Sequence, residues 1–126
     1  MVTWILWALI LAMLAWMGFN YLRIRRAAKI VDNEEFEALI RTGQLIDLRD
    51  PAEFHRKHIL GARNIPSSQL KTSLAALRKD KPVLIYENQR AQRVTNAALY
   101  LKKQGFSEIY ILSYGLDSWK GKVKTS

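Results

Sequence analysis

The sequence predicts an α/β sandwich domain preceded by a single membrane-spanning helix. Two observations lead to this fold class. Residues 2–22 carry no charged side chain, and after Lys29 short apolar runs alternate with segments whose apolar residues recur at helical spacing. Strands separated by helices pair in parallel through right-handed crossovers, so the alternation predicts parallel strands covered by helices.

The membrane helix is predicted from its length and its flanks. About 20 apolar residues suffice to cross a bilayer, and the aromatic rings of residues 2–22 gather toward the two ends, where headgroups favour them. A cleaved signal peptide would carry its basic residues before a shorter apolar core. Here Arg23, Arg25, Arg26 and Lys29 follow the run instead. We therefore expect a single-pass protein of the cell membrane, with the N-terminus outside and residues 23–126 in the cytoplasm.

Composition limits the chemistry. The chain has 126 residues, a net charge of +9, two histidines and no cysteine. The lack of cysteine excludes disulfides, thiolate metal sites and cysteine nucleophiles. Residues 30–119 hold 13 basic and all 11 acidic residues, so the surplus charge flanks the domain. A nucleic-acid binder would carry that charge as a patch on its folded body, so no nucleic-acid partner is expected.

The first half of the domain reads as three strands and three helices. Residues 29–31 form a short strand, and Asp32 with Glu35 forms a capping box for a helix that ends near Gly43. Residues 45–48 form the next strand, 52–57 a short helix and 62–66 a strand end. Ser67 or Ser68 then caps a helix that carries Leu70, Leu74 and Leu77 on one face.

The second half contains two further strands. Residues 83–86 are too short for a helix and too apolar for an edge, so they form a central strand. Apolar residues at helical spacing from Val94 to Leu101 predict a helix that ends at Gly105. Residues 109–112 form the last strand, and a short helix lies near Trp119, which is expected to be a core residue.

Two segments carry a family resemblance. LIDLRDPAEFHRKHILGARNIP, residues 45–66, resembles the first signature of the rhodanese-like domain, and GFSEIYILSYGLDSWKG, residues 105–121, resembles its closing signature. The resemblance covers about residues 30–120 and implies a three-layer sandwich with a five-stranded parallel sheet. The expected organisation is a transmembrane helix at 1–22, a basic juxtamembrane segment at 23–29, a rhodanese-like domain at 30–121 and a basic tail at 122–126.

The resemblance also implies an active loop between the strand 83–86 and the next helix. Counting back from that helix places Asn88 at the family's cysteine, Ala91 at its glycine and Arg93 at its arginine, whereas counting from the strand places Glu87 at the cysteine. Neither residue can hold a transferable sulfur atom, so no catalytic residue and no cofactor is expected. The candidate loop residues are Glu87, Asn88, Gln89, Arg90, Ala91, Gln92 and Arg93.

Two interpretations of this loop stay open. Its backbone N–H groups at a helix start, together with Arg93, form a possible cradle for an anion. Alternatively, it is a solvated loop in which Glu87 pairs with Arg90 or Arg93.

The first signature contributes four residues with expected structural roles. Asp47, Arg49 and Glu53 are expected to tie the loop to the short helix, and His58 to be a partly buried histidine with its hydrogen bonds made. His55 and His58 are three residues apart, but no third ligand accompanies them, so no metal site is expected.

These observations predict a catalytically inactive, membrane-anchored rhodanese-like module that binds or scaffolds an unknown protein partner at the cytoplasmic face. Anionic lipid headgroups are a further expected partner, contacted by the juxtamembrane cluster and by Lys120, Lys122 and Lys124. The alternatives are a sulfurtransferase-related enzyme that uses a partner's thiol, and a small-anion sensor.

Overall fold

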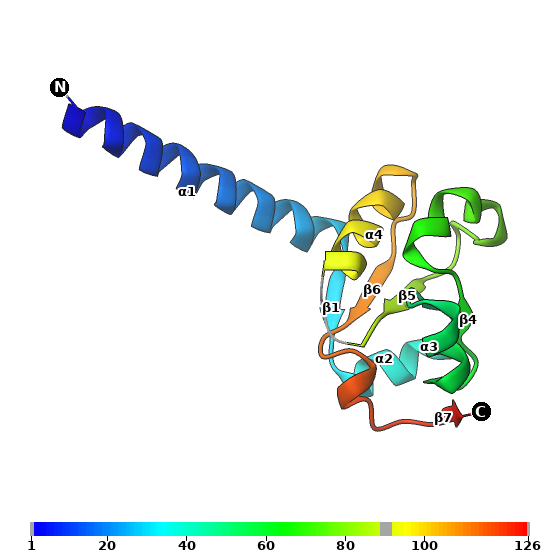
Figure 1. The fold of residues 1–126 in the computed structure, drawn as a ribbon. Coiled ribbons are helices and arrows are strands. Elements are labelled where there is room, and N and C mark those ends of the chain that lie inside the picture. The colour runs from blue at the N-terminus through cyan, green and yellow to red at the C-terminus, as the bar shows by residue number, and fades with distance from the viewer. Residues whose placement is uncertain (1, 89–91, 126) are drawn as a thin grey trace.

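The structure, a computed structural model, describes residues 2–88 and 92–125, with the backbone alone of residues 23–27. A long N-terminal helix leads into an α/β domain (Figure 1). The elements, with η marking 3-10 helices, are α1 (Val2–Ala27), β1 (Lys29–Val31), α2 (Asn33–Ile40), β2 (Gln44–Asp47), α3 (Pro51–Arg56), β3 (Lys57–Ile59), β4 (Arg63–Asn64), η1 (Ser67–Thr72), η2 (Leu74–Ala76), β5 (Val83–Tyr86), α4 (Gln92–Lys103), β6 (Ile109–Leu112), η3 (Leu116–Ser118) and β7 (Val123–Thr125).

The central sheet confirms the predicted fold class. Its five strands are parallel, in the order β1-β6-β5-β2-β4, and all four residues of β5 are buried. Successive side chains of a strand point to opposite faces. Accordingly, Val83 and Ile85 join one apolar cluster with α4 and η1, whereas Leu84 and Tyr86 join a second with Phe36 of α2.

The predicted start of α2 and the predicted end of α4 hold, whereas α4 begins at Gln92, inside the expected loop. Asp32 caps α2 by accepting a 2.9 Å hydrogen bond from the backbone N–H of Glu35. Beyond α4, Gly105 has φ of 100°, and the Phe106 N–H donates to the Leu101 carbonyl at 3.1 Å. The left-handed conformation of Gly105 thus lets the chain turn back and pair a carbonyl that would otherwise have no partner at the helix end.

Two local predictions were wrong. Residues 67–76 form two 3-10 helices rather than one α-helix, because Ser73 (φ −107°, ψ 7°) interrupts them while Leu70 and Leu77 remain buried against the sheet. In addition, Lys57 begins a strand instead of ending a helix. This strand, β3, pairs antiparallel with β7, so most of the expected tail, residues 122–126, lies in a two-stranded sheet.

Helix α1 is the one candidate membrane span among the described residues. The apolar stretch Val2–Leu22 is long enough to cross a bilayer, and none of it is buried inside the structure. The helix continues without a break to Ala27, and Ala28 is buried in the core. It leaves the domain where β1 begins, whereas the C-terminus lies at the opposite end (Figure 1). The exposure of this span distinguishes it from the buried core helix of a domain.

Candidate functional site

The candidate site lies at the carboxyl edge of the sheet, where the loops after β2 and β5 meet. These strands are parallel neighbours, and Asp47 is in register with Tyr86. The segments that follow, carrying Arg49 and Asn88, therefore lie side by side. In open α/β sheets ligands bind outside the carboxyl ends of the strands.

A buried ion pair forms the base of the site. The Arg49 guanidinium donates from Nη2 to Asp47 Oδ2 at 2.8 Å and from Nε to both carboxylate oxygens at 3.1 Å. Asp47 is fully buried and Arg49 is 4% exposed. Burial alone would lower the pKa of Arg49, but hydrogen bonds to Asp47 and its negative charge outweigh this and raise the pKa above its usual value. Arg49 also donates to the Lys57 carbonyl, which fixes the guanidinium further.

Asn88 connects this ion pair to α3. Its Oδ1 accepts a 3.0 Å hydrogen bond from Arg49 Nη1, and its Nδ2 donates to Glu53 Oε2 at 2.7 Å. Both ends of the amide are therefore held. The three side chains line an open pocket of about 250 Å³, whose lining is Arg49, Glu53, Arg56, Lys57, Asn88, Leu116 and Asp117. Of the two residues matched to the family's cysteine, Asn88 is the one that lines this pocket.

Glu87 is directed to the helix instead. It is only 8% exposed, and its Oε2 accepts a 2.9 Å hydrogen bond from the backbone N–H of Val94 in the first turn of α4. A helix N-terminus is where an anion binds, because its N–H groups have no partner within the helix. The protein's own carboxylate occupies this position. The predicted pairing of Glu87 with Arg93 is absent among the described residues.

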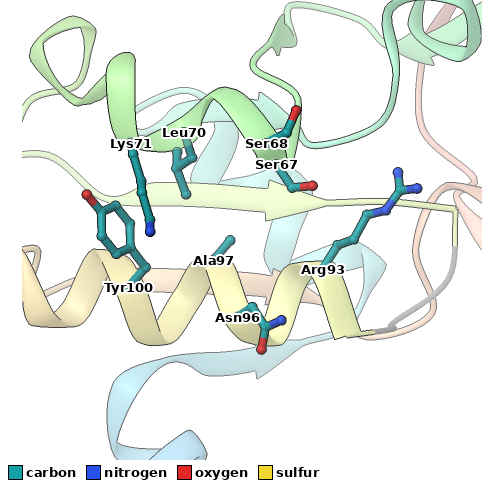
Figure 2. A pocket seen from close by; sticks show the side chains of 8 residues that line it. All are labelled: Ser67, Ser68, Leu70, Lys71, Arg93, Asn96, Ala97 and Tyr100. Carbon is teal, nitrogen blue, oxygen red and sulfur yellow. The ribbon is translucent and has the colours of Figure 1, made fainter.

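Arg93 belongs to a different groove, which corrects its predicted place in the loop. This groove lies between α4 and η1, and Figure 2 shows the side chain of Arg93 at the end of the groove near Ser67. This groove has a volume of about 270 Å³. Successive helical residues are rotated by about 100°, so when Val94 faces the core Arg93 points to the flank of α4. Gln92 hydrogen-bonds Asn96 at 2.9 Å, and Gln89, Arg90 and Ala91 lie outside the described residues.

Two residues that shape the site had no specific role predicted from the sequence. Gly115 has φ of 70°, and a Cβ there would lie 2.4 Å from the Asn88 carbonyl oxygen. This close approach lets Leu116 and Asp117 donate backbone N–H bonds to the carbonyls of Glu87 and Asn88. Asn64 donates to the carbonyls of Asp47 and Arg49 and so holds the neighbouring loop. Membership of the two signatures was the one sequence signal for both.

Two further side chains stabilise the surroundings. The Tyr86 hydroxyl accepts a hydrogen bond from the Ile59 N–H at 3.1 Å, and burial, aided by the nearby Asp47 carboxylate, raises the pKa of Tyr86 above its usual value. The His58 ring stacks on Phe54, and its Nδ1 lies 2.8 Å from the Phe54 carbonyl oxygen. Among the described residues, no three histidine, aspartate or glutamate side chains gather to hold a metal ion.

Comparison with known proteins defines the class. The family model for the rhodanese-like domain matches residues 32–122, so the chain belongs to the rhodanese-like domain family. An uncharacterized protein of Bacillus subtilis, YqhL, is 47% identical over 113 residues, covering 90% of this chain and 89% of that protein. The thiosulfate sulfurtransferase GlpE of Stutzerimonas stutzeri is 36% identical over 95 residues, 73% of this chain and 84% of that enzyme.

Solved structures agree on the fold. The crystal structure of a rhodanese-like domain protein from Staphylococcus aureus superposes with a TM-score of 0.69 at 19% identity, covering 78% of this chain and 98% of that one. A likeness at this identity establishes the arrangement of strands and helices.

Proposed function

We propose that this protein is a membrane-anchored rhodanese-like module that binds a protein partner at the cytoplasmic face and does not transfer sulfur. The observation that carries the proposal is the Asn88 amide, held between Arg49 and Glu53 where the family resemblance places a nucleophile.

The chemistry of the loop supports an inactive site. Sulfur transfer through a covalent intermediate needs a nucleophile that accepts the sulfur atom, and an amide is not one. The sequence contains no cysteine that would replace it. The GlpE relatives are named thiosulfate sulfurtransferases, but that activity is not carried over to a site in which asparagine faces the pocket.

The pocket suits a polar protein segment better than a small anion. Arg49, Arg56 and Lys57 line it together with Glu53 and Asp117, so its lining carries both signs of charge. A free anion would meet two carboxylates there. The anion-sensor alternative is also weakened at α4, because Glu87 already accepts the Val94 N–H and Arg93 lines another groove.

The anchor supports a fixed location. The span Val2–Leu22 is apolar, and the four basic residues of segment 23–29 follow it. Basic residues are retained on the cytoplasmic side of a membrane helix, which supports a cytoplasmic domain.

Turnover with thiosulfate and cyanide tests the proposal. We expect the purified full-length protein in detergent to form thiocyanate no faster than a protein-free reaction, because no side chain accepts the sulfur. Intact mass spectrometry after incubation with thiosulfate should show no added sulfur atom. The GlpE protein of Stutzerimonas stutzeri serves as the positive control. Thiocyanate formation above background, or a covalent sulfur adduct, would overturn the proposal.

A further inference from the structure

The basic and acidic residues of the domain are distributed unevenly between the two edges of its sheet. The amino edge is formed by the starts of the parallel strands, the loops before them and the C-terminal ends of α2 and α4, which run antiparallel to the strands. We call the exposed basic residues there the amino-edge cluster. Its members are Arg41, Arg63, Arg78, Lys79, Lys81, Lys102 and Lys103. The acidic residues at this edge are Asp80, which pairs with Arg78 at 2.5 Å, and Glu108.

The opposite edge collects the remaining acidic residues. They lie at the carboxyl ends of the strands or on the elements that follow directly, and they are Asp32, Glu34, Glu35, Glu37, Asp47, Asp50, Glu53, Glu87 and Asp117. Seven basic residues among those that the structure describes nearly balance them, and they are Arg49, Arg56, Lys57, Arg93, Lys120, Lys122 and Lys124. The domain is therefore strongly positive at one edge and close to neutral at the other.

Helix α1 joins the domain at its positive edge. The candidate span ends at Leu22 and the helix continues to Ala27, five residues that rise about 7.5 Å at about 1.5 Å per residue. Ala28 is buried in the core and Lys29 begins β1, so no linker separates α1 from the domain. Helix α1 also contacts α4, whose last turn carries Lys102 and Lys103. Figure 1 shows α1 meeting the domain at the start of β1 and running obliquely to that strand.

Screening separates the two edges. The Debye length at physiological salt is about 8 Å, so the joint between α1 and β1 lies about one screening length from the end of the span. A four-residue strand such as β5 is about 13 Å long at about 3.3 Å per residue, so the carboxyl edge is farther from this joint than the amino edge is. Lys120, Lys122 and Lys124 lie at that far end, on and beside β7. They were the tail residues expected to contact lipid.

We propose that the amino-edge cluster docks on the anionic headgroups of the leaflet that borders segment 23–29. Attraction between clustered basic residues and anionic lipid acts over this distance. Docking orients the Asn88 pocket away from the membrane, toward a cytoplasmic partner. This inference rests on the anchoring part of the proposed function and assigns the lipid contact to the domain rather than to its C-terminal strand.

Energy transfer from single labels tests the orientation. Because the chain has no cysteine, Ser107→Cys at the amino edge and Ser118→Cys at the carboxyl edge each introduce a unique labelling site. The full-length protein is inserted into nanodiscs of phosphatidylcholine alone or mixed with phosphatidylglycerol, with an acceptor dye on the headgroups. We expect transfer from position 107 to exceed that from 118, to rise with anionic lipid and to fall again with added salt.

Charge reversal identifies the residues. Lys102→Glu with Lys103→Glu should abolish the anionic-lipid-dependent rise at position 107. Lys120→Glu with Lys122→Glu changes the net charge equally and should leave the rise intact. Because glutamate weakens a helix C-terminus, Lys79→Glu with Lys81→Glu, in and beside the turn before β5, provides a second variant outside helices, with circular dichroism as the folding check.

The outcomes separate the two proposals. If energy transfer in the disc-bound protein does not depend on lipid charge, the docking proposal is overturned but the membrane anchor is not. The same holds if the rise is lost only in the Lys120 and Lys122 variant. Protein that does not co-elute with the discs at all would overturn both. Neither result bears on whether thiosulfate is turned over.

Discussion

Arg49 is the residue on which the site depends most. It holds the buried Asp47 carboxylate, the Asn88 amide and the Lys57 carbonyl, and Asn88 in turn holds Glu53. Asn88, which follows β5 by two residues, is thereby fixed to α3. A rigid polar surface of this kind suits recognition, because less conformational freedom is lost when a partner binds.

Replacing Arg49 should destabilise the whole domain. Arg49→Met keeps much of the side-chain volume but leaves Asp47 buried without its partner. Breaking a buried ion pair in this way typically costs about 3–5 kcal/mol in the free energy of unfolding. Denaturant titration of the full-length protein in a neutral detergent, followed by circular dichroism, measures the loss.

Arg78→Met is the matched control. Arg78 also pairs with an aspartate, Asp80, at 2.5 Å, but both side chains are largely exposed to solvent. Exposed pairs contribute little because water and salt screen them. Equal effects of the two substitutions would show that burial of the Asp47–Arg49 pair does not determine its contribution.

The sequence predicted some contacts of the candidate site better than others. The first signature placed Asp47, Arg49 and Glu53 near the loop, and the contacts through Asn88 join those residues. Arg93, a candidate residue of the loop, lines the groove beside η1, since a motif position fixes a place in the chain but not the rotation of a helix about its axis.

At the scale of elements, the segment after β6 closes the site. Gly115 turns the chain so that the start of η3 donates backbone hydrogen bonds to the carbonyls of Glu87 and Asn88 at 2.8 and 3.0 Å. A side chain at this position would meet both carbonyl oxygens, at 2.5 and 2.4 Å. The turn therefore needs glycine twice, for its φ of 70° and for the space.

Comparing two glycine variants separates these needs. Gly61 has φ of 89°, but a Cβ added there would meet nothing within 4 Å, so Gly61→Ala should cost only the left-handed strain, about 1–2 kcal/mol. Gly115→Ala adds a backbone clash, and overpacking typically costs about 1–3 kcal/mol more. Thermal unfolding of both variants in detergent gives the comparison. Similar losses would mean that η3 shifts freely and does not hold the loop.

The sequence predicted those helices and strands whose sequence patterns lie within their own residues. Strands β2, β5 and β6 and helices α2 and α4 have apolar periodicity and caps within their own residues, and they were placed correctly. The β3–β7 pair joins residues 57–59 to 123–125, and nothing in either short run indicates the other. Leucines at 70, 74 and 77 suggested an α-helix, but packing on the sheet decided the local form.

At the scale of the whole molecule, the charge polarity emerges only from the topology. Residues 30–119 carry 13 basic and 11 acidic residues, and this near balance does not show that the two edges of the sheet differ in net charge. The parallel order of the five-stranded sheet collects all of its strand starts at one edge, and α1 enters at that edge. In the proposed docking, the length of α1 beyond Leu22 determines how close the amino-edge cluster comes to the membrane.

Changing that length tests whether α1 sets the docking distance. An eleven-residue alanine–glutamine helix inserted between Ala27 and Ala28 would lift the domain by about 16 Å in three turns, about two Debye lengths. We expect it to abolish the anionic-lipid-dependent energy transfer at position 107. A glycine–serine insert of equal length has a root-mean-square reach of about 18 Å but lets the domain fold back onto the surface, so the dependence should persist. Equal behaviour of the two inserts in the same nanodisc measurement would show that the distance set by α1 does not control the contact.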